Sequence, residues 1–435
     1  MSVASGTAAD YPLGTQLDEG KTKKIFGIRN DPSLVALVAK DDLTAGDGAK
    51  HDILAGKAAF ANETACNALR LLKDCDLPVA FERRLSAMSL LAPKCAMLPY
   101  EVVARREAHG SYLKRNPHMV KGHLFPKLVV ELYLKTKNRS WKDHRLVCDD
   151  PFMTYVAGSE IKLFDPSKPI HGQAAFLTLR PDEVFSMADE AQLFPEMVRL
   201  ARQAFLVLER AWQLAGGRLV DFKVEFGIDT DGQLRLADVV DNDSWRVLRD
   251  GANIDKQVYR EGGALDVVTE NYRQVAEITR SFRLPKQQVV IWTGSEKDNT
   301  APIVSALEAS SGFQIAKIVC SAHKEPIRAV SLLSSVVQAI PNSVVIALIG
   351  RSNGAGPVLA ANTTVPVITV PADVKSFPED VWSSLRMPSS VPVLTVLEPS
   401  NAAQAALQFL AARNPRIYAD LRGRIEERAL NVVEI

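Results

Sequence analysis

Short, continuous apolar runs recur through the last third of this sequence and restrict how it can fold. They occupy residues 289–292, 314–319, 344–349, 365–370 and 391–396. Longer segments with helical patterns separate them. Strands that are apolar throughout, in a strand-helix-strand order, are typical of a parallel sheet that helices cover on both faces. The pattern predicts a three-layer αβα domain in this part of the chain.

The chain changes character near Pro285. Before that point, short strands and helices mix irregularly, which is typical of α+β folds. A long helix is expected over 264–282, and a polar linker should follow it. Because 435 residues are too many for one hydrophobic core, we expect two domains, 1–284 and 285–435. Residues 159–195, rich in Pro, Asp and small side chains, should form a long surface excursion.

Composition excludes several classes of protein. Lys and Arg number 52 and Asp and Glu 51, so the chain is no general polycation and we expect no nucleic-acid partner. The five cysteines show neither a disulfide framework nor zinc-ligand spacing. No apolar run approaches the roughly 18–20 residues of a membrane span, and the first ten residues do not resemble a secretory leader. We therefore expect a soluble, cytoplasmic protein with no membrane partner.

The segment 219–229, LVDFKVEFGID, carries charges at every second position. Asp221, Lys223 and Glu225 alternate with apolar residues, so a strand here would place three charged side chains on one face. A face with that pattern predicts either a solvated surface or a polar site.

A hairpin signal follows this strand. If Asp231-Gly232 forms a two-residue turn, Glu225 lies directly opposite Asp238. Two facing carboxylates predict a Mg²⁺ site that also takes phosphate oxygens, with Lys223 as a fixed positive charge. A solvated hairpin face is the alternative, and a change of register would place Asp238 opposite Lys223 instead.

The N-terminal motif EGKTKKIF, residues 19–26, is a candidate phosphate-binding turn. It places Gly20, Lys21 and Lys23 just before an expected strand, where a turn with lysines can reach phosphate oxygens. One glycine with nearby lysines is a weak signal, and a solvated basic turn is the alternative.

Two further segments could form ligand loops. Residues 40–52 are rich in turn residues and carboxylates, which fits a ligand loop or an ordinary hairpin end. Residues 104–117, ARREAHGSYLKRNP, group arginines that include Arg105 around Ser111. Guanidinium groups suit carboxylate and phosphate oxygens, and a surface charge run is the alternative.

Together these segments resemble phosphoribosylaminoimidazole-succinocarboxamide synthase (SAICAR synthetase) over roughly residues 11–283. The motifs that carry the resemblance are EGKTK, LTAGDGA, ARREAHGSYLKRNP, LVDFKVEFGID, LADVVDNDSWR and DKQVYR. The resemblance implies an ATP-grasp-like fold, ATP and Mg²⁺, and the ligation of L-aspartate to the carboxylate of carboxyaminoimidazole ribonucleotide (CAIR). The γ-phosphate of ATP would convert that carboxylate to an acyl phosphate, which the aspartate amine attacks.

The resemblance also implies roles for residues of this sequence. Those expected to bind ATP phosphates are Gly20, Lys21 and Lys23, and those expected to bind Mg²⁺ are Glu225 and Asp238. Those expected to hold CAIR and aspartate are Arg105, Ser111 and Arg246, with Lys223 and Asp221 at the reacting centre. Asp150 lies in a segment similar to a carboxylate-bearing segment of the family.

Three loops follow the first three apolar runs of the second domain. Their sequences are GSEKDN at 294–299, CSAHKEP at 320–326 and GRSNGAG at 350–356. Open parallel sheets bind ligands at the carboxyl ends of their strands, so these loops should converge on a site. His323 is the expected proton-transfer group, because histidine titrates near neutrality, and Lys324 adds positive charge. A lone loop histidine with an ordinary surface role is the alternative.

The second domain resembles phosphoribosylaminoimidazole carboxylase (AIR carboxylase) over about residues 287–412. The motifs are GRSNGAGPVLAANTTVPVITVP and DVWSSLRMPS, similar to the animal, CO₂-using form that is fused behind a synthetase. The resemblance implies a Rossmann- or flavodoxin-like domain, a homo-octamer, and carboxylation of aminoimidazole ribonucleotide (AIR) without biotin or ATP. It implies catalytic roles for Ser321, His323 and Lys324, nucleotide contacts from Ser295, Asp298 and Ser321, and a CO₂ pocket formed by Arg351, Ser352, Asn353 and Gly354.

One departure from the carboxylase pattern concerns the phosphate loop. Lys297 stands where the family has a phosphate-binding serine, and Glu296 brings a negative charge beside it. Lys297 could replace the serine contact with a point charge, or the nucleotide site could be impaired.

The two resemblances together lead us to expect a bifunctional enzyme of purine (IMP) biosynthesis. A synthetase whose degenerate second domain is only an oligomerisation scaffold is the alternative.

Overall fold

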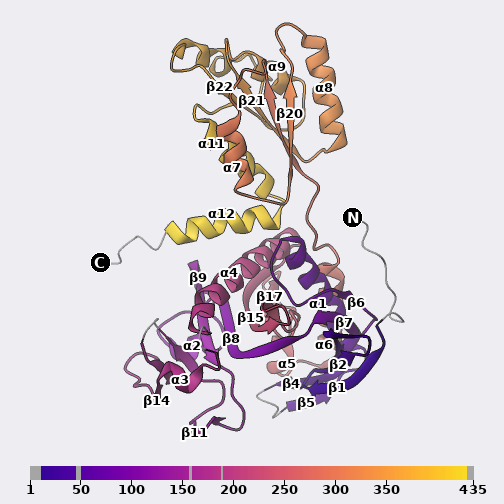
Figure 1. The fold of residues 1–435 in the computed structure, drawn as a ribbon, viewed down its shortest axis with the longest axis vertical. Helices are drawn as coiled ribbons and strands as arrows, with labels where there is room; N and C mark the ends of the chain where they lie inside the picture. The colour runs from indigo at the N-terminus through magenta and orange to yellow at the C-terminus, as the bar shows by residue number, and fades with distance from the viewer. Residues whose placement is uncertain (1–10, 46–49, 156–158, 188–189, 429–435) are drawn as a thin grey trace. The chain divides into compact units, whose positions relative to one another are not determined.

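The computed structural model describes residues 11–45, 50–155, 159–187 and 190–428 (Figure 1). Two compact units divide the chain: one runs to Arg283 and takes in the chain again from Ile425 onward, and the other spans Leu284–Arg424. No helix in the described ranges combines the length and apolar character needed to cross a membrane. Residues 46–49 of the LTAGDGA motif and the first ten residues lie outside the described residues.

A five-stranded antiparallel sheet begins the first unit, in the order β1-β2-β3-β7-β6. Its strands are β1 (Leu13–Glu19), β2 (Lys23–Ile28), β3 (Asp31–Ala39), β6 (Arg83–Arg84) and β7 (Ser89–Pro93). β4 (Asp42–Ala45) pairs with β5 (Lys50–Ile53) in a separate hairpin. Helix α1 (Lys57–Asp74) packs against β3 and against α6 (Leu265–Thr279). The expected helix at 264–282 is therefore present and slightly shorter.

A nine-stranded sheet forms the rest of the first unit, in the order β14-β13-β12-β9-β8-β15-β17-β18, with β16 also paired to β15. Its strands are β8 (Cys95–Glu107), β9 (Leu124–Leu134), β12 (Phe152–Thr154), β13 (Ile161–Phe164), β14 (Leu177–Leu179), β15 (Arg218–Asp229), β16 (Leu234–Ala237), β17 (Trp245–Arg249) and β18 (Ala252–Asn253). The long helix α4 (Glu190–Leu214) packs on β8 and β15, where Phe205 and Phe222 meet edge to face. The shorter elements are α2 (Ser111–Arg115), β10 (Ser140–Trp141), β11 (His144–Arg145), α3 (Pro181–Val184) and α5 (Gln257–Arg260).

The prediction that residues 159–195 form a long surface excursion is wrong for much of that segment. β13 and β14 extend the nine-stranded sheet, and Ile161 and Leu163 are fully buried. The segment also contains α3 and the start of α4. These strands are only three and four residues long, too short to show clear periodicity in the sequence.

The predicted hairpin register is also wrong by one residue. β15 and β16 pair Glu225 with Ala237 and Ile228 with Leu234, and the Asp229 N–H bonds to the Gln233 carbonyl at 3.0 Å. Three residues rather than two therefore form the loop, and Gly232 takes a positive φ of 77°. A three-residue hairpin loop commonly needs glycine at that left-handed position, so the same Asp-Gly pair fits either turn.

The second unit is a five-stranded parallel sheet in the order β20-β19-β21-β22-β23. Its strands are β19 (Gln288–Thr293), β20 (Gln314–Val319), β21 (Ser343–Ile349), β22 (Val367–Pro371) and β23 (Leu394–Thr395). Its helices are α7 (Ala301–Glu308), α8 (Pro326–Ala339), α9 (Ala355–Ala361), α10 (Trp382–Leu385) and α11 (Pro399–Ala411), with a 3₁₀ turn at Pro378–Val381. Helix α12 (Pro415–Arg428) begins in this unit, and its residues from Ile425 belong to the first. The predicted α/β sheet and its strand positions are confirmed.

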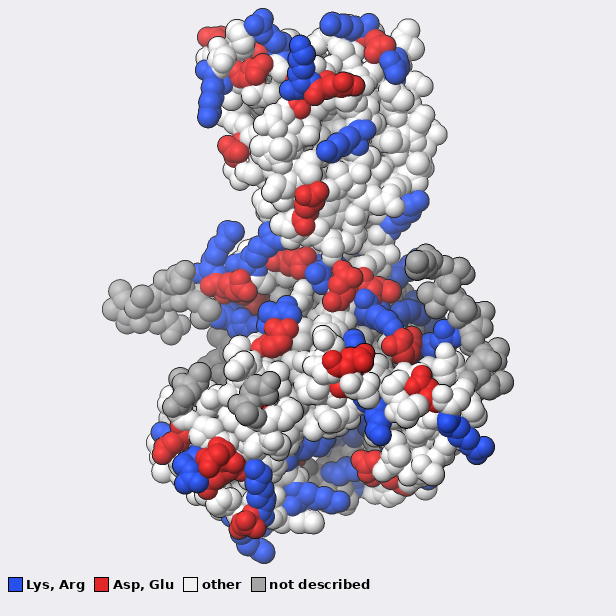
Figure 2. All heavy atoms as spheres, viewed as in Figure 1, with Lys and Arg blue, Asp and Glu red and all other residues white. Residues whose placement is uncertain are grey.

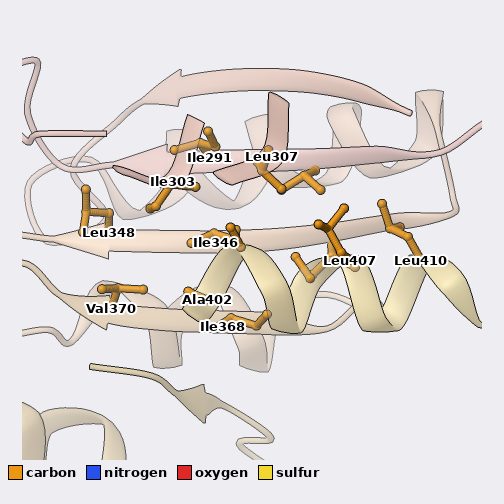
Figure 3. Close-up of a cluster of buried hydrophobic side chains, with 14 of the residues drawn as sticks. Ile291, Ile303, Leu307, Ile346, Leu348, Ile368, Val370, Ala402, Leu407 and Leu410 are labelled. Carbon is orange, nitrogen blue, oxygen red and sulfur yellow. The ribbon is translucent and has the colours of Figure 1, made fainter. Parts of the chain in front are cut away.

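Helices cover both faces of this sheet, which explains the continuous apolar runs. Ile291 and Ile346 pack against α7 and α11 on one face (Figure 3). Their neighbours Trp292 and Ala347 pack against α8 and α9 on the other. Successive side chains of a strand point to opposite faces, so both must be apolar.

Acidic and basic side chains are interspersed on the surface. Figure 2 shows this mixture on its visible face, as the near-zero net charge predicts.

Candidate active sites

A cavity of about 360 Å³ lies between the two sheets of the first unit. Apolar side chains of both sheets line it, among them Ile25, Val35, Leu37, Ala92 and Met97. Charged groups also line it, including Lys23, Lys135, Glu225 and Asp238. A cavity lined by both kinds of side chain suits a ligand with an aromatic ring and phosphates.

The turn between β1 and β2 brings the N-terminal motif to this cavity. The Gly20 N–H bonds to the Lys23 carbonyl at 2.9 Å, and both residues line the cavity. Lys21 is exposed on the turn and is absent from the lining. The structure therefore brings together two of the three residues predicted for phosphate binding.

Lys23 is paired with one of the two predicted metal ligands. Its ammonium forms an ion pair with Asp238. Burial lowers the pKa of Lys23 to about 8, although Glu225 and Asp241 favour its charged form. The neighbouring carboxylates thus oppose the effect of burial on this lysine.

Glu225 and Asp238 both line the cavity, although they are not cross-strand partners. By simple alternation Asp238 would face away from Glu225, but β16 has ended at Ala237 and the Asp238 backbone turns through a left-handed φ of 71°. Glu225 is buried and binds the Lys135 ammonium at 2.5 Å. The two carboxylates thus line the same cavity because the backbone turns at Asp238, and not because they are cross-strand partners.

The donor set fits Mg²⁺ as a partial shell. In this structure each carboxylate forms an ion pair with a lysine, Asp238 with Lys23 and Glu225 with Lys135. Among the described residues no group of three or more His, Cys, Asp or Glu side chains could hold a metal. A Mg²⁺ ion here would take its remaining ligands from phosphate oxygens and water, as this ion usually does.

A buried network of charged groups lies along the centre of the nine-stranded sheet. Asp221 accepts hydrogen bonds from Arg105 at 2.7 Å and from Arg246 at 2.5 Å. Arg105 also bonds to Glu131 at 2.7 Å and to the Ser111 hydroxyl at 3.1 Å. The four predicted residues Arg105, Ser111, Asp221 and Arg246 therefore lie together.

The network contains a third guanidinium, that of Arg115. It is ion-paired with Glu131, and its Nη1 has no hydrogen-bond partner among the described residues. Arg105, Arg115 and Arg246 are therefore ion-paired with only two carboxylates, those of Asp221 and Glu131. A buried cluster of guanidiniums favours an anionic ligand.

Lys223 lies on the same strand as Asp221. Its ammonium bonds to Glu101 at 2.6 Å. Burial disfavours the charged form, but Glu101 outweighs it and raises the pKa of Lys223. Asp150, which is near this lysine, has its pKa raised by burial. Lys223 therefore remains a fixed cation beside the network.

A second lysine-carboxylate cluster was missed by sequence reasoning. Asp243 accepts from Lys57 at 2.9 Å, from Lys256 at 3.1 Å and from the Tyr272 hydroxyl at 2.7 Å. Burial opposes ionisation, but the two lysines hold the pKa of Asp243 below its usual range, while burial raises that of Asp241 to about 6. Asp243 and Lys256 lie inside the motifs LADVVDNDSWR and DKQVYR, so those motifs were the available signal.

Two further polar residues of the sites come from β9 and its end. Glu131 and Lys135 were not predicted, although a single Glu within the apolar run LVVELYL is a signal of a polar partner. Their partners Arg105 and Glu225 are more than twenty residues away in sequence.

In the second unit, the loops that follow β19, β20 and β21 converge. A β-carbon added at Gly354 would lie 2.9 Å from His323 Nε2, and one added at Gly350 would lie 3.1 Å from Asp298 Oδ1. Both glycines therefore permit close approach of the loops. The carboxyl ends of these strands flank the point where the strand order reverses, where open α/β sheets bind ligands.

The side chains of these loops are mostly exposed. His323, Lys324, Ser295 and Arg351 are exposed, and Ser321 is partly buried. Ligand contacts from such groups need no rearrangement of the core.

Two of the predicted loop residues have internal partners. Asp298 Oδ2 accepts the N–H groups of Gly294 and Ser295 at 3.1 and 3.0 Å, which closes the first loop. Asn353 is fully buried; its amide donates to Ser384 at 2.8 Å and accepts from Thr369 at 2.6 Å. Asn353 thus anchors the third loop.

The third loop has a strained backbone and a stacked arginine. Ser352 and Asn353 take positive φ values of 68° and 41°, and the Ser352 N–H bonds to Asp380 at 3.0 Å. The Arg351 guanidinium lies 4.0 Å from the centroid of the Phe377 ring. Non-glycine residues with positive φ are uncommon and often mark ligand loops.

Taken together, the first unit has the architecture and charged cavity of an ATP-grasp-like ligase, and the second is a flavodoxin-like parallel-sheet domain with a ligand site at its switch point. The family model described as SAICAR synthetase matches residues 16–160 and 177–278, and the model described as AIR carboxylase matches residues 288–430. The chain belongs to the family of bifunctional enzymes that contain both domains. The alternative, a synthetase with a degenerate second domain, is not supported.

Relatives named for both activities match this chain over most of their length. A bifunctional phosphoribosylaminoimidazole carboxylase/phosphoribosylaminoimidazole succinocarboxamide synthetase from Drosophila melanogaster is 36% identical over 428 residues, which cover 95% of this chain and 92% of the relative. The Homo sapiens protein of the same name is 34% identical, with 96% and 95% coverage. A solved phosphoribosylaminoimidazole-succinocarboxamide synthase from Ehrlichia chaffeensis is 25% identical, with a TM-score of 0.49, and covers 61% of this chain and 99% of its own.

Proposed function

We propose that this enzyme catalyses two consecutive steps of purine biosynthesis. Residues 285–435 would carboxylate AIR with CO₂ to give CAIR, and residues 1–284 would ligate CAIR to L-aspartate with ATP to give SAICAR. The observation that carries the proposal is the presence of both family domains, each with its own polar site, in one chain.

In the carboxylation step, ring carbon 4 of AIR attacks CO₂ and forms the new carbon–carbon bond. His323 then removes the proton from the same ring carbon, which restores the aromatic ring. His323 lies against the Gly354 backbone, so a ligand held by the 350–354 loop would contact its imidazole. Ser295, Ser321 and Asp298 would hold the nucleotide. Arg351, Ser352, Asn353 and Gly354 would form the CO₂ pocket, in which the buried Asn353 anchors the loop through its hydrogen bonds to Ser384 and Thr369.

In the ligation step, the CAIR carboxylate attacks the γ-phosphorus of ATP, and ADP leaves. The aspartate amine then attacks the acyl carbon of the acyl phosphate, loses a proton and expels inorganic phosphate. Gly20, Lys21 and Lys23 would bind the phosphates of ATP. The positively charged network of Arg105, Ser111 and Arg246 would hold the anionic substrates, with Asp221 and Lys223 beside the reacting atoms.

Mg²⁺ is the proposed metal of this site, held by Glu225 and Asp238. When bound, it would neutralise part of the charge on the transferred phosphoryl group. Lys23 and Lys135 balance the same carboxylates in the structure, and we propose that they shift to phosphate oxygens when nucleotide and metal bind.

We also propose that the enzyme works without biotin, in the cytoplasm, as a homo-octamer assembled through the second unit. Its partners would be its small-molecule substrates, with neither nucleic acid nor membrane. The mass of the assembly in solution tests the octamer.

The carboxylase half is tested with full-length protein supplied with AIR and CO₂ but neither ATP nor aspartate. We expect CAIR to form, and His323→Ala to abolish it while SAICAR synthesis from supplied CAIR continues. If the wild-type protein forms no CAIR but still makes SAICAR, the second unit is a scaffold, and Glu296 and Lys297 are the first residues to examine.

A further inference from the structure

The ladder between β8 and β9 is irregular beside the substrate-binding network. Arg105 pairs with Val129, but the next paired residue of β8, Glu107, lies opposite Leu124. Residues 125–128 of β9 therefore fall opposite Arg106 alone. Such a bulge re-aims nearby side chains, and its backbone N–H and C=O groups need partners other than the facing strand.

Two side chains supply those partners. Glu426 Oε2 accepts the N–H of Leu128 at 2.9 Å, and Arg106 Nη1 donates to the carbonyl of Phe125 at 3.1 Å. The same two side chains bind each other, with Arg106 Nη2 donating to Glu426 Oε1 at 2.6 Å. Glu426 is only 2% exposed. One carboxylate thus holds both strands at the irregular position.

Arg106 is fixed from a second direction as well. Its Nε and Nη2 donate to the two carboxylate oxygens of Glu209 on α4, at 2.6 and 3.3 Å. Successive side chains in a strand point to opposite faces, so Arg106 points to this helix while Arg105 points to Asp221 and Glu131. Glu426 therefore acts on the backbone next to Arg105 without reaching the substrate.

Glu426 lies inside the segment that the AIR carboxylase model matches, residues 288–430, yet it belongs to the first compact unit. We infer that Glu426 is a positioning residue for SAICAR synthesis, which sets the position of Arg105 on β8 and of Glu131 on β9. This inference rests on the proposed function of the first unit. Glu426, on the last turns of α12, would thus help to complete the synthetase site.

The test compares the full-length variants Glu426→Ala, Glu426→Gln and Glu427→Gln. Glu427 is the exposed neighbour and serves as the matched control. Glu426→Ala should raise the KM for CAIR at least about tenfold while the KM for ATP stays within about twofold, because only the arginine network moves. Glu426→Gln keeps an oxygen that can accept from Leu128 and should recover part of the loss. Glu427→Gln should behave as wild type.

Two results would overturn the inference. One is an unchanged KM for CAIR in Glu426→Ala. The other is a lower kcat with every KM unchanged, which would mean that part of the protein had simply unfolded. If Glu426→Ala does not fold, the KM for CAIR and the kcat of Glu426→Gln test the inference by the same two criteria. If the wild-type protein measured alongside makes no SAICAR, the proposed function fails instead, so the two failures are distinguishable.

Discussion

Replacing Asp221 with Asn tests whether the buried network is organised as described. Asp221 accepts from two buried guanidiniums, Arg105 at 2.7 Å and Arg246 at 2.5 Å. Glu131 and Asp221 are the two carboxylates that pair with the guanidiniums of Arg105, Arg115 and Arg246, and Asp221→Asn would leave only one of them charged. Asparagine also has a single acceptor oxygen, and its amide N–H groups would face guanidinium donors.

The expected cost follows from these contacts. Breaking a buried ion pair by removing one partner costs about 3–5 kcal/mol. Asparagine keeps one hydrogen bond, so we expect about 3 kcal/mol, which corresponds to a fall in the melting temperature of the first unit of roughly 6–12 °C. The kcat/KM for CAIR should fall about 100-fold because Arg105 and Arg246 lose their shared anchor.

Calorimetry of the full-length protein and SAICAR assays from supplied CAIR measure the two effects. Asp231→Asn, the same change at an exposed position of the neighbouring loop, is the control and should leave both quantities unchanged. A variant of Asp221 that melts and catalyses like the wild type would refute the reasoning.

Three further predictions concern both units. Glu225→Ala and Asp238→Ala should each lose SAICAR synthesis and require more Mg²⁺ for any residual rate; full activity at low Mg²⁺ in both variants would contradict the metal assignment. Lys297→Met should raise the KM for AIR about tenfold in a steady-state carboxylase assay if this lysine replaces the serine contact; an unchanged KM would show that the phosphate does not reach it. Asn353→Ala removes two buried hydrogen bonds, to Ser384 and Thr369, and should lower the stability of the second unit by about 2–3 kcal/mol; an unshifted urea midpoint for that unit would contradict its anchoring role.

The fold of the second unit could be predicted closely because its sheet is covered on both faces. After Ser343, every position of the central strand β21 is apolar, and at least one helix separates each pair of consecutive strands. Sequence runs and observed strands therefore agree within a few residues at β19, β20, β21 and β22. The edge strand β23 is shorter than its apolar run, whereas β20 at the other edge matches its run in full.

The first unit was harder to predict because its sites depend on long-range pairing. Glu131 and Lys135 reach the sites only through the pairing of β8 with β9 and of β8 with β15. The hairpin register was wrong because an Asp-Gly pair fits both two- and three-residue loops, and only the observed hydrogen bonds decide between them. Glu426 gave no sequence signal at all, because its partner Arg106 lies 320 residues away.

The most direct test of a two-step enzyme is an isotope experiment in one vessel. Wild-type protein would receive AIR, ¹³C-bicarbonate in equilibrium with CO₂, ATP, Mg²⁺ and L-aspartate. We predict SAICAR with ¹³C at its carboxamide carbonyl, and labelled CAIR alone when ATP is omitted. SAICAR that forms only from supplied CAIR, and never carries the label, would contradict the account.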